Sequence, residues 1–314
     1  MLTLQQEHGK ITAVCVKTMQ RSMHMAAYRI ITDSSCDLTQ EMADALELAI
    51  APLSVNHDGE VRANYLDGRE LNVKEFYQSM RDGAMYSTSA ANPTLWRAVA
   101  EPVLQNGEDV LILAFSSGLS TTCNAARIAA EELMEEYPER KIYVVDTLCA
   151  SLGQGMMCWY VAKKRQEGAS LEEVKAYAEE IIPHMAHWFT VNDLFFLKRG
   201  GRVSGATAVV GTMLQIKPVM HVDDEGHLIN VSKARGRKAS LEALAAKVGE
   251  DAIEPEKQTM FISHGDCLED AEYVAKILQE KYHVPEIHFN HVGPVIGSHT
   301  GPGVVAMFYF GKKR

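Results

Sequence analysis

One stretch of the chain decides the fold: Asp109-Val-Leu-Ile-Leu-Ala-Phe-Ser116-Ser117-Gly118-Leu-Ser120-Thr-Thr-Cys123-Asn-Ala-Ala-Arg-Ile-Ala-Ala-Glu-Glu-Leu133. Its first part is a short, continuous apolar run, which is typical of a strand buried on both faces of a parallel sheet. Its last part places alanines and Leu133 on one helical face and glutamates on the other. The stretch therefore predicts a strand, a loop and a helix in succession.

The loop between them is rich in small hydroxyl residues and contains one glycine. Backbone N–H groups at the start of the following helix would point at one spot, where the helix dipole favours an anion. The alternative is that Ser120 or Thr121 only caps the helix, and the residues leave both open. No lysine follows the glycine and no GxSxG surrounds the serines. These absences exclude a nucleotide P-loop and a nucleophile elbow.

Composition sets the class of protein. A chain of 314 residues predicts about two domains under the usual length of roughly 100–200 residues each. The formal charge of −10 argues against nucleic acid or an anionic membrane surface as the main partner. The six cysteines form no CxxC pair and have no metal-ligand spacing, so we expect reduced, buried thiols in a cytoplasmic protein.

The first 27 residues differ from the rest. Their one apolar run, Ile11 to Val16, is too short for a signal peptide core or a membrane span. They have no helical or strand period. We therefore expect residues 1–27 to be a leader of uncertain order that the fold does not need.

Residues 28–183 alternate strands with helices, which predicts an N-terminal α/β domain built on a parallel sheet. Besides the run that starts at Asp109, strands are predicted at Tyr28–Thr32, Leu48–Val55 and Lys141–Asp146. Helices are predicted at Leu38–Leu46, with Asp37 as its cap, at Leu95–Gln105, and from Ser170 to near Pro183.

Residues 184–314 have a different character and predict an α+β domain. A hairpin is expected from Ile216–Val222 and Leu228–Ser232, after an apolar helix that ends near Gln215. Helices near Arg237–Val248 and Leu268–Tyr282 then alternate with strands at Gln258–Ser263 and Glu286–Val292, and Val304–Gly311 is the last strand.

Eight short motifs lie in order along the chain. They are ITDSSCDL at 31–38, TSAANP at 88–93, SSGLS at 116–120, LKRGGR at 197–202, IKP at 216–218, KARGRK at 233–238, SHGD at 263–266 and SHTGPG at 298–303. In this series the chain resembles the DegV family from Tyr28 to its end. The resemblance implies two domains that hold a long-chain fatty acid in the cleft between them. It also implies that the bound acid is presented to a separate fatty acid kinase, which makes an acyl phosphate for phospholipid synthesis.

The resemblance also assigns site residues. The carboxylate of the fatty acid would be held by Thr88 and Ser89, by Ser117 with the Gly118 amide, and by His299. The fatty acid would be the only small molecule required, so neither a cofactor nor a metal is expected.

The chemistry of the residues favours a carrier over an enzyme. Ser117 and His299 could act as nucleophile and base, but no orienting carboxylate is evident. His264 with Asp266 could form a general-base pair, and aspartates after strands could hold a metal, but neither has the spacing of a complete site. We therefore expect no catalytic residue. The alternative is a small-molecule enzyme of phosphotransferase type on the same α/β layout, and such an enzyme should show a nucleotide site.

Three cations, Lys198, Arg199 and Arg202, surround a Gly-Gly pair in an acidic chain. One interpretation is the end of a helix, with Gly200 as its left-handed cap. The other is a docking surface for an acidic partner, for which the resemblance suggests the kinase, or for transient contact with anionic phospholipid. The two interpretations are compatible.

Overall fold

The computed structural model describes residues 27–203 and 215–314. The expected leader, apart from Ala27, and most of the expected apolar helix before Gln215 therefore lie outside the described residues. The first sheet has four parallel strands in the order β2-β1-β6-β7, which confirms the parallel sheet that the sequence predicts. The strands are β1 (Tyr28–Asp33), β2 (Ala49–Ala51), β6 (Asp109–Ala114) and β7 (Ile142–Asp146).

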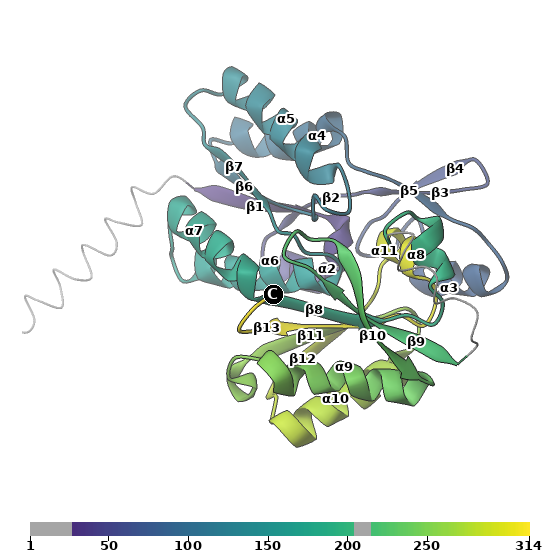
Figure 1. The fold of residues 1–314 in the computed structure, drawn as a ribbon. Coiled ribbons are helices and arrows are strands. Elements are labelled where there is room, and N and C mark those ends of the chain that lie inside the picture. The colour runs from purple at the N-terminus through teal and green to yellow at the C-terminus, as the bar shows by residue number, and fades with distance from the viewer. Residues whose placement is uncertain (1–26, 204–214) are drawn as a thin grey trace, which may run out of the picture.

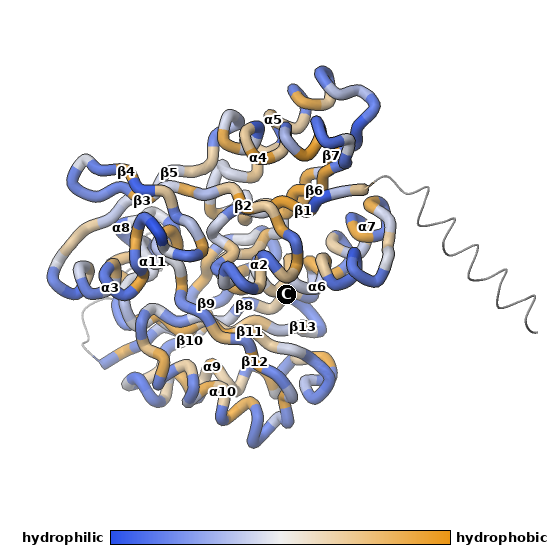
Figure 2. Tube along the Cα trace, turned by 180° about the vertical axis from the view of Figure 1, so that it is seen from behind, coloured by the Kyte–Doolittle hydropathy of each residue, from blue (hydrophilic) through white to orange (hydrophobic). Residues whose placement is uncertain are grey.

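Helices cover both faces of this sheet (Figure 1). The helices α4 (Pro93–Gln105) and α5 (Thr122–Glu136) pack on one face, and α6 (Leu152–Gln166) and α7 (Leu171–Ile181) on the other. Burial on both faces explains the continuous apolar run of β6, all six residues of which are buried. In Figure 2 the strands β1 and β6 are accordingly among the most hydrophobic parts of the trace.

The second sheet has six strands in the order β10-β9-β8-β13-β11-β12. They are β8 (Met185–Thr190), β9 (Ile216–Val222), β10 (Leu228–Arg235), β11 (Thr259–His264), β12 (Glu286–His291) and β13 (Val305–Phe310). Helices α9 (Arg237–Asp251) and α10 (Leu268–Tyr282) cover its outer face. Its inner face packs on α6, so this helix lies between the two sheets (Figure 1).

Two features were not predicted. A small sheet, β4-β3-β5, contains β3 (Ser54–His57), β4 (Glu60–Ala63) and β5 (Ser87–Ser89). The single strand predicted at 48–55 is therefore wrong, because Pro52 separates β2 from β3 and the two pair with different sheets. The other feature is α11 (Pro294–Thr300), which packs near α3 (Val73–Arg81) and β5.

Asp37 does not cap a helix. Thr39 caps the short helix α2 (Gln40–Ala45), and Asp37 has a left-handed backbone with φ of 51°. Its carboxylate is buried and accepts a hydrogen bond from the Ser151 hydroxyl at 2.5 Å. The prediction failed because a residue with positive φ cannot serve as the extended residue that precedes a helix.

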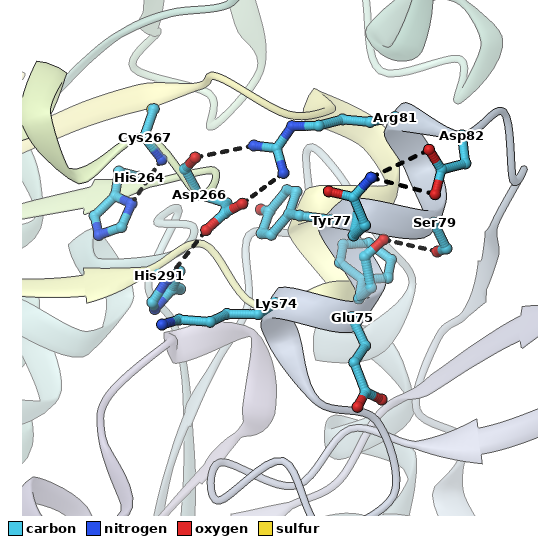
Figure 3. A network of polar contacts seen from close by, with 12 residues as sticks. Lys74, Glu75, Tyr77, Ser79, Arg81, Asp82, His264, Asp266, Cys267 and His291 are labelled. Atoms are coloured by element: carbon cyan, nitrogen blue, oxygen red, sulfur yellow. Dashed lines mark hydrogen bonds and ion pairs between the residues drawn. The ribbon is translucent and has the colours of Figure 1, made fainter.

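Side chains of α3 join the two halves of the molecule (Figure 3). Arg81 donates to the Asp266 carboxylate at 2.5 Å and to its carbonyl at 2.9 Å. The buried Tyr77 hydroxyl donates to the Val292 carbonyl at 2.7 Å. These contacts link α3, whose buried side chains pack in the core of the first sheet, to the loops that follow β11 and β12 of the second sheet.

Candidate functional site

A cavity of about 820 Å³, part of it open to solvent, lies between the two sheets. Both halves of the chain supply its walls, which are largely apolar. The large side chains include Leu53, Phe115, Phe189, Leu197, Val222 and Phe308.

Polar groups gather at one part of this lining. Thr88 and Ser89 come from β5, Ser120 from the loop after β6, Arg202 from the segment after α8 (Phe195–Arg199), and His299 from α11. A neighbouring polar hollow of the surface shares three of these residues, so this part of the lining is the mouth. The cavity is therefore amphipathic, with a polar mouth and a largely apolar interior.

His299 is the most constrained group of the mouth. Its Nε2 and the Thr88 hydroxyl lie 2.8 Å apart. Its buried Nδ1 has no hydrogen-bond partner among the described residues. Burial, followed by the charges of Arg202 and Arg199, lowers the pKa of His299 to about 4. The imidazole is consequently neutral at pH 7.

Gly200 makes room for this imidazole. A Cβ atom at position 200 would lie 2.2 Å from His299 Nδ1, so any side chain there would displace the ring. Gly200 has an ordinary right-handed backbone, whereas Gly201 has a φ of 69°. The prediction of Gly200 as the left-handed cap was therefore wrong. A glycine is needed at position 200 because the His299 ring approaches closely, and at position 201 because the backbone φ is positive.

The loop after β6 does not bring all its predicted residues to the cavity. Ser117 is exposed, and its amide donates to Asp146 Oδ1 at 3.1 Å. The Gly118 amide donates to the Ser116 hydroxyl at 3.2 Å. Neither residue lines the cavity, whereas Ser120 does. The carboxylate contacts assigned to Ser117 and Gly118 stay predictions that this geometry does not favour.

A hairpin from the second half decides the orientation of this loop. The Ser116 hydroxyl donates to the Gly226 carbonyl at 2.9 Å, at the turn between β9 and β10. A Cβ atom on Gly118 would lie 2.7 Å from the Glu225 carbonyl oxygen. The close approach of the β9–β10 turn therefore requires a glycine at position 118 of the loop after β6. Ser120 also accepts from the Thr122 amide at 3.2 Å. Thr121 occupies the N-cap position of α5, but this helix has no side-chain capping hydrogen bond. The interpretation of Ser120 or Thr121 as a helix cap is therefore wrong, and the Ser120 hydroxyl is left to line the cavity.

The three cations of the LKRGGR motif have different environments. Lys198 is exposed on α8, beside Phe195, which is 52% exposed. Arg199 donates to the Ser298 carbonyl at 3.2 Å, and Arg202 donates to the Leu119 carbonyl at 3.3 Å. Within the described residues no carboxylate pairs with either arginine, so both positive charges at the mouth are uncompensated.

The catalytic alternatives gain no support from the geometry. His264 accepts from the Cys267 amide at 3.2 Å, and Asp266 pairs with Arg81, so the two do not form a general-base pair with each other (Figure 3). Asp33 accepts from the Ser35 and Phe115 amides and stabilises loops. Residues 27–203 and 215–314 contain no group of three or more side chains placed to hold a metal ion.

Known proteins share both the sequence and this architecture. The family model described as "Uncharacterised protein, DegV family" matches residues 27–312. The chain belongs to the DegV family. A DegV domain-containing protein of Clostridium perfringens is 42% identical over 92% of this chain and 99% of its own length.

Solved DegV structures are similar as well. A DegV family protein from Thermus thermophilus, described as binding fatty acid, has a TM-score of 0.80 and 32% identity over 91% of this chain and 99% of its own. The fatty acid-binding DegV of Bacillus subtilis has a TM-score of 0.79 and 27% identity over 91% and 100%. Among the residues described here, no helix combines the length and apolar character needed to cross a membrane.

Proposed function

We propose that this DegV protein is a carrier that holds one long-chain fatty acid in the cavity, with its carboxylate at the mouth. The observation that carries the proposal is the amphipathic lining. It is largely apolar inside and polar at the mouth, where Arg199 and Arg202 have no carboxylate partner within residues 27–203 and 215–314. The fatty acid binding described for the Thermus and Bacillus relatives supports it.

Thr88, Ser89, Ser120, Arg202 and His299 are the proposed contacts of the carboxylate. When Thr88 donates to Nε2 of the neutral His299, the ring hydrogen is on Nδ1, which has no partner in the part of the chain that the structure describes. Arg202 supplies the compensating charge.

Two contributions set the affinity. Burial of the tail contributes about 0.8 kcal/mol per methylene, so a sixteen-carbon acid gains on the order of 10 kcal/mol before the cost of ordering it. A charge-assisted hydrogen bond to the carboxylate contributes about 1.5–3 kcal/mol. The tail therefore determines how tightly the acid binds, and the mouth determines which end faces outward.

Arg202→Gln tests the polarity of binding. We expect it to weaken palmitate binding about 10- to 100-fold, which corresponds to one charge-assisted hydrogen bond. Binding of hexadecanol, which has the same chain and no charge, should change much less. Isothermal titration of both ligands measures the difference, and the exposed Arg69→Gln is the matched control. Equal losses for acid and alcohol would contradict a carboxylate at Arg202.

We further propose that the mouth presents the carboxylate to a fatty acid kinase. The exposed Lys198 and Phe195 on α8 lie next to the mouth and suit a partner with an acidic, partly apolar surface. Arg199 and Arg202 are less available to such a partner, because each already binds backbone carbonyls.

Lys198→Glu should leave palmitate affinity unchanged and slow acyl-phosphate formation about tenfold at low salt. Rim charges act mainly on the association rate, so the deficit should shrink as salt rises. The control is Lys276→Glu, an exposed lysine of α10 on the outer face of the second sheet. If the variant keeps the full kinase rate but exchanges lipid slowly with anionic vesicles, α8 contacts membranes instead of the kinase.

A further inference from the structure

The lining of the cavity contains a buried polar side chain outside the cluster at its mouth. His187 is the third of the six residues of β8. It is 1% exposed and contributes to the lining of the cavity. A buried polar side chain in an otherwise apolar lining has a cost unless it gains a partner.

The hydrogen bonds of His187 fix which nitrogen is free. Nδ1 lies 2.7 Å from the Met185 carbonyl oxygen, which can only accept, so Nδ1 carries the hydrogen. Burial, followed by the charge of Arg314, lowers the pKa of His187 well below its ordinary value, so the ring is neutral. Nε2 is therefore a bare acceptor, and it has no partner among the described residues.

The ring cannot turn easily to find another partner. A Cβ atom at Gly153 would lie 2.1 Å from Nε2, so α6 packs closely against the ring. The Phe308 ring meets it edge-on, with centroids 5.1 Å apart and an angle of 81°. The ring of His187, a residue of the cavity lining, is thus held in place together with its unpaired Nε2.

A second inner group of the lining, Ser151, has the same polarity. It is 4% exposed and has a φ of 55°, a strained conformation for a residue with a side chain. Its hydroxyl donates to Asp37 Oδ2 at 2.5 Å and lies 2.9 Å from the Ser263 hydroxyl. When Asp37 is ionised, above about pH 7, the only hydrogen of Ser151 goes to Asp37, and Ser263 donates to Ser151. What Ser151 can still offer is an oxygen lone pair.

We propose that His187, assisted by Ser151, binds a hydroxyl group on the acyl chain, so that the preferred ligand is a long-chain hydroxy fatty acid. The inference rests on the proposed function, because it takes the cavity as the acyl site. Two acceptors match a group that donates. A hydroxyl group on the chain supplies a hydrogen to Nε2. A plain methylene chain leaves Nε2 unpaired, and a keto oxygen, itself an acceptor, would face the two acceptors of His187 and Ser151.

The test compares hydroxy and keto acids on the same protein. Dissociation constants are measured for stearate, for hydroxystearates from the 6-hydroxy to the 14-hydroxy acid, and for the matching oxostearates. We expect at least one hydroxystearate to bind as tightly as stearate and about 10-fold tighter than its own oxo acid, which corresponds to about one hydrogen bond gained instead of lost. If no member of the series meets both conditions, the assignment is overturned.

Variants locate the effect. His187→Phe should abolish the hydroxy-to-oxo ratio of the best pair, and using the ratio cancels any general loss of affinity. The matched control is His221→Phe, a buried histidine of the same sheet that stacks on Trp188 at 4.2 Å and does not line the cavity. This control should keep the ratio, and a ratio that survives His187→Phe overturns the role of His187.

Failure of every acid to bind, stearate included, contradicts the proposed function itself. Binding of stearate without any preference for a hydroxy acid overturns only the hydroxyl assignment.

Discussion

Ala306→Phe is expected to abolish stable binding of long-chain fatty acids. Ala306 lies on β13, is 7% exposed and lines the cavity from the second sheet. A phenyl ring there would occupy the space of the acyl tail. Excluding four or more methylenes removes about 3 kcal/mol, so palmitate affinity should fall about 100-fold or more.

Two comparisons separate a blocked cavity from a damaged fold. Ala306→Ser keeps a small side chain and should bind palmitate nearly as the wild type does. The blocked variant should still bind a short acid such as octanoate about as well as the wild type, because the mouth is unaltered. A phenylalanine variant that is folded by thermal denaturation and binds palmitate normally would place the tail elsewhere.

The second large effect concerns Asp37. Burial raises the pKa of this carboxyl from its ordinary value of 3.8 to about 7. The folded protein thus holds a proton up to about pH 7, whereas the unfolded chain releases it near pH 4. Stability contributed by this group is complete below pH 4 and is lost as pH rises to about 7.

Asp37→Asn removes this titration. Between pH 5 and pH 8 the variant should gain about 2–3 kcal/mol of stability relative to the wild type, measured by urea unfolding at both pH values. The difference between the two proteins isolates Asp37, because other buried groups such as Asp33 and His299 titrate in both. Asp58→Asn, at an exposed turn, is the control. A constant difference between wild type and variant across this range would show that Asp37 has no raised pKa.

Periodicity predicted most of the fold. The helix expected at Leu268–Tyr282 has those bounds, and the strand–loop–helix from Asp109 is present. In contrast, α11 was not predicted, because its glycine and hydroxyl residues are typical of a loop. Position 297 of that helix is a glycine because of tertiary packing: a Cβ atom there would lie 2.6 Å from the Tyr77 hydroxyl.

The site was predicted less completely than the fold. The structure brings Thr88, Ser89 and His299 together, as the family resemblance implied, from segments up to 211 residues apart. Sequence reasoning assigned Arg202 to a partner-docking spot near the mouth of the cleft, and that role stays a prediction. Its place in the cavity lining was not predicted, because a pattern does not give the direction of a side chain in an irregular segment.

Ser120 and His187 were missed as cavity residues for related reasons. Strand periodicity ends before the loop that contains Ser120, so the sequence cannot say which of its serines faces inward. His187 is one residue of a fully buried strand, where alternation gives no signal. Only the pairing of β8 with its neighbours assigns it to the inner face.

Mass spectrometry of lipid extracted from the purified wild-type protein, with Ala306→Phe beside it, tests the carrier proposal most directly. The account predicts close to one long-chain fatty acid per wild-type chain and almost none in the blocked variant. Wild-type protein that contains no fatty acid, and that takes up none when it is offered, would contradict the account.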